Sequence, residues 1–409
     1  MKRRLLDVLV CPRCHGPFEL EAFEEEPTSG WAAGAIACAR LCAWRGMPVS
    51  DAVSVDDCRR CYATDVLEGA LACRECATRF PIINGVPRLL RPALLAQLER
   101  RYPDFFARHA EFLAGTAPVT DPLADTLESF TRQRLDLRPP GPEFAHQWTE
   151  HLRRNLGRSA SVESLRGAVI LDVGCGFGRH LYVASEAGAE VVGVDLSGGV
   201  DVARRNNLGH ARCHIVQADV YDRPFREGSF DIVWSFGVLH HMPNPRAGFE
   251  AIAPFAKADR GLVAIWVYGY RGMAFTYRLS HMRSLHRVSR RLSSRARVRV
   301  SKAVAALLAG LYWEPLRLVK RIGLGRVVER LPLAQYVDHG WIARVAGVHD
   351  RLSTPITHFH DREELREWFA AARLQEVSVE DTNRRGWRAH GRRRTPVLAP
   401  ADLMTTEGR

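Results

Sequence analysis

The sequence lacks any long uninterrupted apolar run. Its longest run, Ala303 to Trp313, is well short of the roughly 20 residues that a membrane-spanning helix needs. A shorter apolar run near the start is interrupted by Asp7 and is too short for the core of a signal peptide. We therefore expect a cytoplasmic protein without a transmembrane segment.

Lysine is scarce throughout the chain, and acidic residues are absent from one long segment. The 58 basic residues outnumber the 46 acidic ones, giving a net charge of +12, yet the only lysines are Lys2, Lys257, Lys302 and Lys320. Between Arg271 and Trp313 the chain has no acidic residue at all. Such a basic balance favours an acidic partner, such as nucleic acid, an anionic lipid surface or a phosphorylated metabolite, but does not choose among them.

Eight of the ten cysteines precede residue 77 and lie in close pairs. Such pairs are more typical of metal ligands in a reducing compartment than of disulfides. The segment from Gly34 to Val53 is repeated from Gly69 to Val86, and each copy follows another cysteine pair. The repeat predicts two structural four-cysteine zinc sites, the first made of Cys11, Cys14, Cys38 and Cys42 and the second of Cys58, Cys61, Cys73 and Cys76.

The stretches "LLDVLVCPRCHGPFEL" and "LACRECATRFPIINGVPRLL" resemble the zinc-ribbon family of methyltransferase-activator subunits, known as partners of transfer-RNA methyltransferases. The resemblance covers residues 1–90 and implies tandem zinc ribbons with a stabilising or substrate-presenting role. The first repeat departs from the family pattern at "RGMPVSDAV". Residues 91–158 are charged and helix-like, and we expect them to form a linker and a helical cap whose last helix begins near Glu143 and lies over the ligand of the next domain.

A buried strand, a glycine-rich loop and a helix are predicted from Val169 onward. The apolar run "AVILDV" is typical of a parallel strand, and "RHLYVASEAGA" of a helix. Between them, Gly174, Gly176 and Gly178 let the backbone approach a ligand and present amides at a helix N-terminus. That loop suits a dinucleotide, a nucleotide or S-adenosylmethionine.

The next three strands each end near a ligand-facing group, where open α/β sheets bind their ligands. Asp195 is placed for the hydroxyls of a ribose, Asp219 for an adenine amino group, and Ser235 and Phe236 for the edge of the crevice. Asp172 opens the glycine loop and can meet the amino group of a methionine moiety, whereas it would repel a pyrophosphate. These residues favour S-adenosylmethionine over a nicotinamide cofactor.

The motifs "VILDVGCGFGRH", "VVGVDLS", "VQADVYDRPF", "SFDIVWSFGVLHHMPNP" and "LVAIWVYG" resemble, in order and spacing, those of class I S-adenosylmethionine-dependent methyltransferases of the ubiquinone/menaquinone-biosynthesis-like group. The resemblance implies an α/β Rossmann-like sheet of seven strands over residues 159–269 and 346–395, with the last two strands at "EVSVED" and "GWRAHGRR". It also implies cofactor contacts from Cys175, Leu196 and Val220, beside the residues named above.

Methyl transfer needs orientation of the reactants and, where the acceptor loses a proton, a base. His240 or His241 is a candidate base because histidine titrates near neutral pH, and a purely structural role is the alternative for both. Tyr268, His358 and His360 are weaker candidates. No "NPPY"-type tetrapeptide for the methylation of base amino groups follows the fourth strand, and Cys175 and Cys213 are not placed as pyrimidine nucleophiles.

A basic helical insertion is predicted at residues 270–345, where a lid over the substrate would lie, and residues 396–409 are expected to be a flexible tail. The insertion carries Arg283, Arg287, Arg290, Arg291, Arg295, Arg297, Arg299 and Lys302, with Met282, Leu285, Val288 and Leu292 at helical spacing. Such a helix could contact an anionic membrane surface, a phosphorylated substrate or RNA, or could be a solvated face.

Two functions remain: methylation of a small-molecule or lipid-linked acceptor, and methylation of RNA. A binding module without activity is disfavoured.

Overall fold

The computed structural model describes residues 1–28, 38–50, 53–113, 127, 130–131, 135, 141–270, 292–329, 331, 333–353, 356–382 and 386–394. Half of the predicted basic cluster, from Arg283 to Arg291, and the predicted tail lie outside these residues. Within the described chain, no helix combines the length and apolar character required to cross a membrane.

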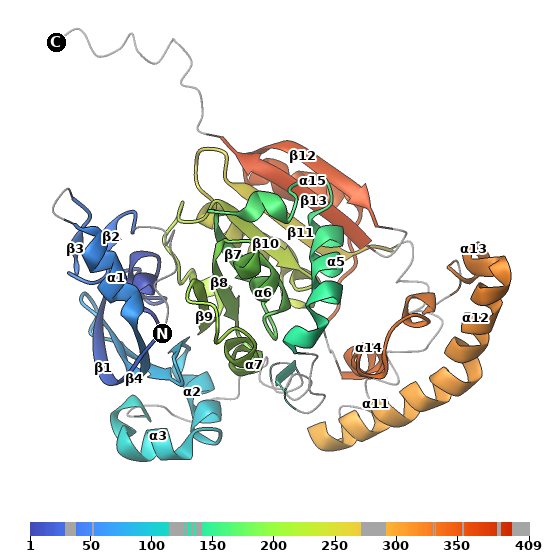
Figure 1. The fold of residues 1–409 in the computed structure, drawn as a ribbon, viewed down its shortest axis with the longest axis horizontal. Coiled ribbons are helices and arrows are strands. Elements are labelled where there is room, and N and C mark those ends of the chain that lie inside the picture. Colours follow the sequence, from blue (N-terminus) through green and yellow to red (C-terminus); the bar gives the residue numbers. More distant parts are fainter. Residues whose placement is uncertain are drawn as a thin grey trace, which may run out of the picture.

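A seven-stranded sheet forms the centre of the molecule (Figure 1). Its strands lie in the order β9-β8-β7-β10-β11-β13-β12, and β13 runs antiparallel to both of its neighbours. The apolar runs read from the sequence form the parallel part, and the two strands expected at the end of the domain are confirmed. The bounds are β7 Val169–Val173, β8 Glu190–Asp195, β9 Cys213–Ala218, β10 Ile232–Phe236, β11 Leu262–Tyr268, β12 Leu374–Asp381 and β13 Gly386–Arg393.

Helices cover both faces of this sheet because alternate strand residues point in opposite directions. Ile170 and Trp234 belong to the core beneath α5 (Ala145–Leu156), α6 (Arg179–Glu186) and α7 (Gly199–Asn206). Leu171 and Val233 belong to the core beneath α8 (Pro245–Ile252) and α15 (Arg362–Ala371). The predicted cap helix is α5, which packs on α6.

The N-terminal region continues the same sheet instead of forming a separate module. Its strands β1 (Phe18–Pro27), β4 (Thr64–Cys73), β5 (Arg79–Ile83) and β6 (Val86–Leu89) extend the order to eleven strands. The junction is a parallel pairing of β6 with β9, with Arg88 opposite Gln217. Leu5 and Leu9 share one hydrophobic core with Val216 and Phe225. The region also contains η1 (Arg3–Asp7), α1 (Val55–Ala63), the hairpin β2 (Leu41–Cys42) and β3 (Met47–Pro48), and the helices α2 (Pro92–Glu99) and α3 (Pro103–Arg108).

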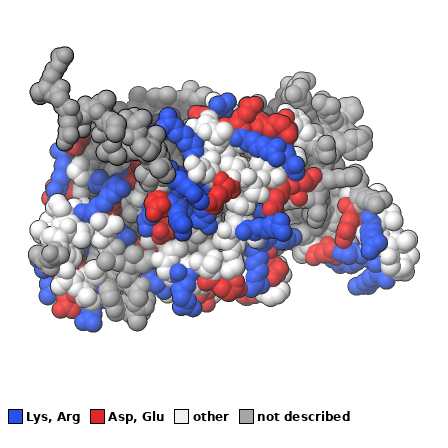
Figure 2. Space-filling view, turned by 90° about the horizontal axis from the view of Figure 1, so that it is seen from above, with Lys and Arg blue, Asp and Glu red and all other residues white. Residues whose placement is uncertain are grey.

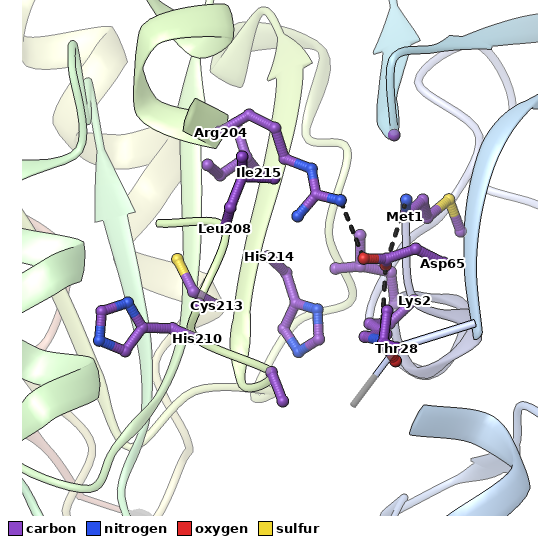
Figure 3. A pocket seen from close by; sticks show the side chains of 14 residues that line it. Met1, Lys2, Thr28, Asp65, Arg204, Leu208, His210, Cys213, His214 and Ile215 are labelled. Carbon is purple, nitrogen blue, oxygen red and sulfur yellow. Dashed lines mark hydrogen bonds and ion pairs between the residues drawn. The ribbon is translucent and has the colours of Figure 1, made fainter. Parts of the chain in front are cut away.

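Buried ion pairs reinforce this junction. Arg88 has no solvent exposure and donates to Asp201 on α7 at 2.6 Å and to Gln217 on β9 at 2.8 Å. Figure 3 shows Asp65 between Arg204, at 2.8 Å, and the amino groups of Met1 and Lys2. Since a buried charge is tolerated only when it is paired, these contacts fix the two regions against each other.

The insertion after β11 is helical, as predicted, and lies at the opposite end of the molecule from β1 (Figure 1). It contains α11 (Ser294–Leu308), α12 (Glu314–Val319), α13 (Gly325–Val328) and α14 (Trp341–Ser353), which crosses the boundary predicted at residue 346. Trp313, Val337 and Val345 form part of its own core. Of the predicted basic cluster, Arg295, Arg299 and Lys302 are exposed on α11, whereas Arg297 is buried.

Candidate functional site

The glycine loop between β7 and α6 is shaped by positions that exclude side chains. Gly174 has a φ of +76°, and a Cβ there would lie 2.2 Å from the side chain of Val238. Gly178, with a φ of +82°, caps α6, and a Cβ there would lie 2.6 Å from the amide nitrogen of Asn207. Positive φ values favour glycine, so the loop folds back tightly and exposes its backbone to the space above the sheet.

A cavity of about 460 Å³ opens at the carboxyl ends of the parallel strands, within the usual range for ligand sites. The glycine loop, β8, β9 and β10 form one side, and Tyr336, Gly347 and Asp350 of the insertion form the other. The predicted residues that line it are Gly174, Cys175, Gly176, Asp195, Leu196, Asp219, Val220, Phe236, His241 and Tyr268. The structure thus brings most of the predicted site together, beneath the insertion.

Asp195 lies at the end of β8 with its carboxylate fixed by three donors. Oδ2 accepts the N–H of Gly176 at 2.9 Å, and Oδ1 accepts the N–H and the hydroxyl of Ser197 at 2.8 and 2.7 Å. These bonds join the glycine loop to β8 and leave the carboxylate on the wall of the cavity. A fixed acceptor at this point can receive the hydroxyls of a ribose.

Asp219 is already engaged in the structure. Oδ1 accepts the N–H of Tyr221 at 3.0 Å, and Oδ2 pairs with Arg91 at 2.7 Å. Arg91 follows β6 of the N-terminal region and also bonds Asp222. The N-terminal region therefore supplies a charged group to the adenine end of the predicted cofactor site, a contribution that the sequence motifs gave no means of finding.

Asp172 lies behind the cavity wall. The side chain is buried, and this burial raises its pKa to about 7. Its Oδ2 has no hydrogen-bond partner among the described residues and lies 4.0 Å from Nδ1 of His180. Nε2 of His180 lies 3.0 Å from Nδ1 of His151. The side-chain amide of Asn155 donates to the same Nδ1 of His151 at 3.0 Å. His151 and His180 line the cavity, so Asp172 reaches the ligand space through these two rings.

His241 is the better placed of the two predicted histidines. Its Nδ1 donates to the carbonyl of Ile356 at 3.0 Å. The other ring nitrogen, Nε2, lies 4.0 Å from Asp350 on α14. The hydroxyl of Tyr268 lies 3.4 Å from the other oxygen of Asp350. The three residues form one polar cluster at the insertion side of the cavity. Neither Asp350 nor Tyr336 is marked by any motif, because both come from a helical segment whose position the sequence does not specify.

His240 is packed beneath this cluster. It stacks on Tyr268 with 3.8 Å between ring centroids, its Nδ1 accepts the N–H of Tyr268, and burial holds its pKa well below the usual value. It does not line the cavity, and neither do Asp172, Gly178, Ser235, His358 and His360. The hydroxyl of Ser235 is buried and has no hydrogen-bond partner among the described residues.

The cysteine grouping predicted from the repeat is wrong. Cys11 and Cys14 lie against Cys73 and Cys76, and the four sulfurs are all within 4.8 Å of one another. The sulfurs of Cys11 and Cys76 are 3.7 Å apart and those of Cys14 and Cys73 are 3.4 Å apart. Four thiols at this separation fit a tetrahedral zinc shell, in which each metal–sulfur distance is about 2.3 Å. The antiparallel pairing of β1 with β4 brings the first pair to the last, so the repeats are not two ribbons in tandem.

Two family models match the chain. Residues 171–261 match the one described as a methyltransferase domain, and residues 2–85 match the one described as Trm112p-like protein. The first match covers the glycine loop and the strands around the cavity, and the second covers the four-cysteine cluster.

The curated relatives are similar to part of the chain. Tocopherol O-methyltransferase of Arabidopsis thaliana is 37% identical over 29% of this chain and 36% of its own length. Demethylmenaquinone methyltransferase of Clavibacter sepedonicus is 38% identical over 26% and 44%, and the mouse protein named "Probable tRNA methyltransferase 9B" is 34% identical over 25% and 22%. The chain thus spans less than half the length of these relatives.

Among solved structures, a complex that contains the Haloferax volcanii Trm112 methyltransferase activator is similar over 66% of this chain and 97% of that one, at 14% identity and a TM-score of 0.38.

Proposed function

We propose that this chain, in which a methyltransferase domain follows a Trm112p-like region, transfers a methyl group from S-adenosylmethionine to a small-molecule or lipid-linked acceptor. The observation that carries the proposal is the cavity, which joins the cofactor side of the sheet to a polar cluster beside the insertion. A compact acceptor fits such a space. The tocopherol and demethylmenaquinone methyltransferases that resemble part of this chain support the same substrate class.

The chain's own residues would hold the cosubstrate in an extended pose across the strand ends. Asp195 receives the ribose hydroxyls, and Leu196 and Val220 lie beside the adenine. Arg179, His151 and His180 face the methionine end. S-adenosylmethionine supplies a methyl group on a sulfonium sulfur, and the protein contributes mainly proximity and alignment.

His241 acts as the base in this proposal. The methyl group would come from bound S-adenosylmethionine, and Nε2 of His241 would take the proton that the acceptor loses. Asp350 then stabilises the imidazolium across 4.0 Å, and the carbonyl of Ile356 holds the ring in the required orientation. Tyr268 positions Asp350 through its hydroxyl.

RNA is the second candidate acceptor. The net charge of +12, the Trm112p-like region and the mouse relative favour it. On the face in Figure 2, basic and acidic side chains are interspersed rather than gathered into one basic block, which favours the smaller acceptor. Phosphate contacts make RNA binding fall steeply with salt, so a methylation rate that is flat from low to physiological salt is expected for a small acceptor.

The deciding experiment follows a labelled methyl group from S-adenosylmethionine into a cell extract, which is then separated into RNA, protein, and organic-soluble or low-mass fractions. Label in the organic or low-mass fraction is expected. Label in nuclease-sensitive material would replace the proposed acceptor with RNA. A His241→Gln protein serves as the control for the label that this site transfers.

A further inference from the structure

A second set of four cysteines lines a small cavity in the N-terminal region, separate from the Cys11 cluster. Cys38, Cys42, Cys58 and Cys61 share this cavity with Arg4 and Asp57. Cys42 and Cys61 are buried, and Cys38 and Cys58 are partly buried. We propose that these four thiols form a second structural metal site, for zinc or another divalent ion that prefers sulfur, so that the two sites are nested along the chain.

Each pair of thiols is presented by a regular local structure. Cys58 and Cys61 lie three residues apart on α1, which places them on one face of the helix. The start of α1 is fixed because the hydroxyl of Ser54 accepts the N–H of Asp57 while Asp57 accepts the N–H of Ser54. Cys42 ends β2 and pairs with Met47, and the N–H of Gly46 donates to its carbonyl at 2.7 Å. A helix pair and a hairpin pair thus face one cavity.

Asp7 fixes the turn that carries the hairpin pair. Its carboxylate accepts the backbone N–H groups of Ala39, Arg40 and Leu41 at 2.8, 2.9 and 2.7 Å. These are the three residues between Cys38 and Cys42. Asp7 is itself 2% exposed and bonds Arg4 at 2.7 Å. The buried carboxylate of Asp7 holds the backbone of this turn and so orients both thiols. A cysteine pair with three intervening residues can therefore present its thiols as a pair with two intervening residues does.

Charge in the cavity also suits thiolate ligands. Arg4 lines it and carries a positive charge beside the sulfurs, which offsets part of the excess negative charge that four thiolates leave around a divalent ion. Arg4 reaches Glu190 on β8 at 3.0 Å. The site would therefore brace the hairpin and α1 against the central sheet.

The cavity has a volume of about 10 Å³, close to that of a single water-sized particle. Among the described residues, the Cys11 set is the group of three or more candidate ligands whose ligand atoms all lie within 4.8 Å of one another, so the second set is more widely spaced. A metal–sulfur distance of about 2.3 Å requires α1 and the hairpin to move toward each other when the ion binds. The consequence is two ions in each chain.

The test is the metal content of the full purified chain and of two matched variants, Cys58→Ser and Cys14→Ser. Two zinc ions are expected in the unmodified protein and one in each variant, whereas one ion in the unmodified protein and one in Cys58→Ser would overturn the proposal. Methyl transfer plays no part in this readout, so the result is independent of the proposed function.

A second measurement leaves all four thiols of the second site in place. Zinc released to a chelator should appear in two phases, and Asp7→Asn should speed one of them at least tenfold because the turn loses its charged acceptor. Cys14→Ser should remove the other phase. Asp56→Asn, on the exposed side of α1, is the control and should leave both phases unchanged. If Asp7→Asn releases zinc as the unmodified chain does, Asp7 does not organise a metal site.

Discussion

Asp172 shows how far a single residue's behaviour follows from its burial. Its pKa is raised to about 7 because burial disfavours the charged form. The folded state therefore holds a proton that the unfolded state has lost, and the free energy of unfolding falls as the pH rises from about 4 to about 7. The loss is about 1.4 kcal/mol for each unit of pKa difference.

Asp172→Asn should remove this dependence, because the amide stays neutral. We expect the variant to gain stability relative to the unmodified chain when the pH is raised from 5 to 7.5, as measured by urea unfolding of the ligand-free proteins. An equal pH dependence in both proteins would contradict the raised pKa.

Asp195→Ala should weaken S-adenosylmethionine binding at least a hundredfold, because the loop loses its bond from Gly176 and the ribose loses its acceptor. Calorimetry measures the affinity, and the thermal unfolding temperature without ligand tests whether the fold is kept. Glu250→Gln is the matched control, since Glu250 is exposed on α8, pairs with Arg246 and does not line the cavity. Unchanged affinity in Asp195→Ala would remove the ribose assignment.

His241→Gln should lower the methylation rate constant by about 10²–10⁴-fold, the usual contribution of a general base, while S-adenosylmethionine affinity stays within about threefold. A rate near that of the unmodified protein would mean that the acceptor needs no base or uses another one.

The sequence identified Gly174, Asp195 and His241 because each follows a strand whose apolar run is easy to recognise, and strand ends meet at one edge of a parallel sheet. It did not identify Asp350 or Arg91, which come from segments that only the tertiary structure brings to the cavity. Asp172 and Ser235 were expected in the cavity, but both side chains are buried within the sheet and neither lines it.

At the scale of elements, the insertion contributes to the site and does more than cover it. Asp350 on α14 contacts both His241 and Tyr268. The helical character of the segment was predictable from its composition, whereas the contact of α14 with the end of β11 depends on a core of its own around Trp313 and Val345.

Asp350→Asn should reduce the rate constant more than it reduces acceptor affinity, because the carboxylate acts on the imidazolium that forms during transfer. Steady-state kinetics separate the two effects. Asp338→Asn, on the exposed surface of the same insertion, should leave both parameters unchanged. An increase in KM alone would assign Asp350 to acceptor binding instead.

The cysteine elements show why local repetition can mislead. Repeated segments suggested that each pair joins the next pair, but β1 and β4 run antiparallel and bring the first cysteines to the last. Sequence spacing identifies candidate cysteine pairs, but it does not say which pairs meet, because the intervening chain decides that.

At the scale of the whole molecule, the N-terminal region and the central domain share one sheet, joined by the pairing of β6 with β9. Neither the continuity of the sheet nor the role of Arg88 could be predicted, since the pairing joins segments more than a hundred residues apart.

Arg88→Met should lower the free energy of unfolding by about 3 kcal/mol, because it removes a fully buried ion-pair partner and leaves the partly buried Asp201 with Arg101 at 3.5 Å. The double variant Arg88→Met/Asp201→Asn should recover part of that loss. Urea unfolding followed by zinc release and by tryptophan fluorescence should give one shared transition. Two separate transitions would show that the regions unfold independently.

The pairing of β6 with β9 has a consequence for the synthesis and folding of the protein. A central domain made without its N-terminal region would present the backbone of β9 as an open edge, and open edges recruit strands from other molecules. In the intact chain β6 of the N-terminal region covers this edge, so a central domain made alone is expected to associate through β9 more readily than the full chain does.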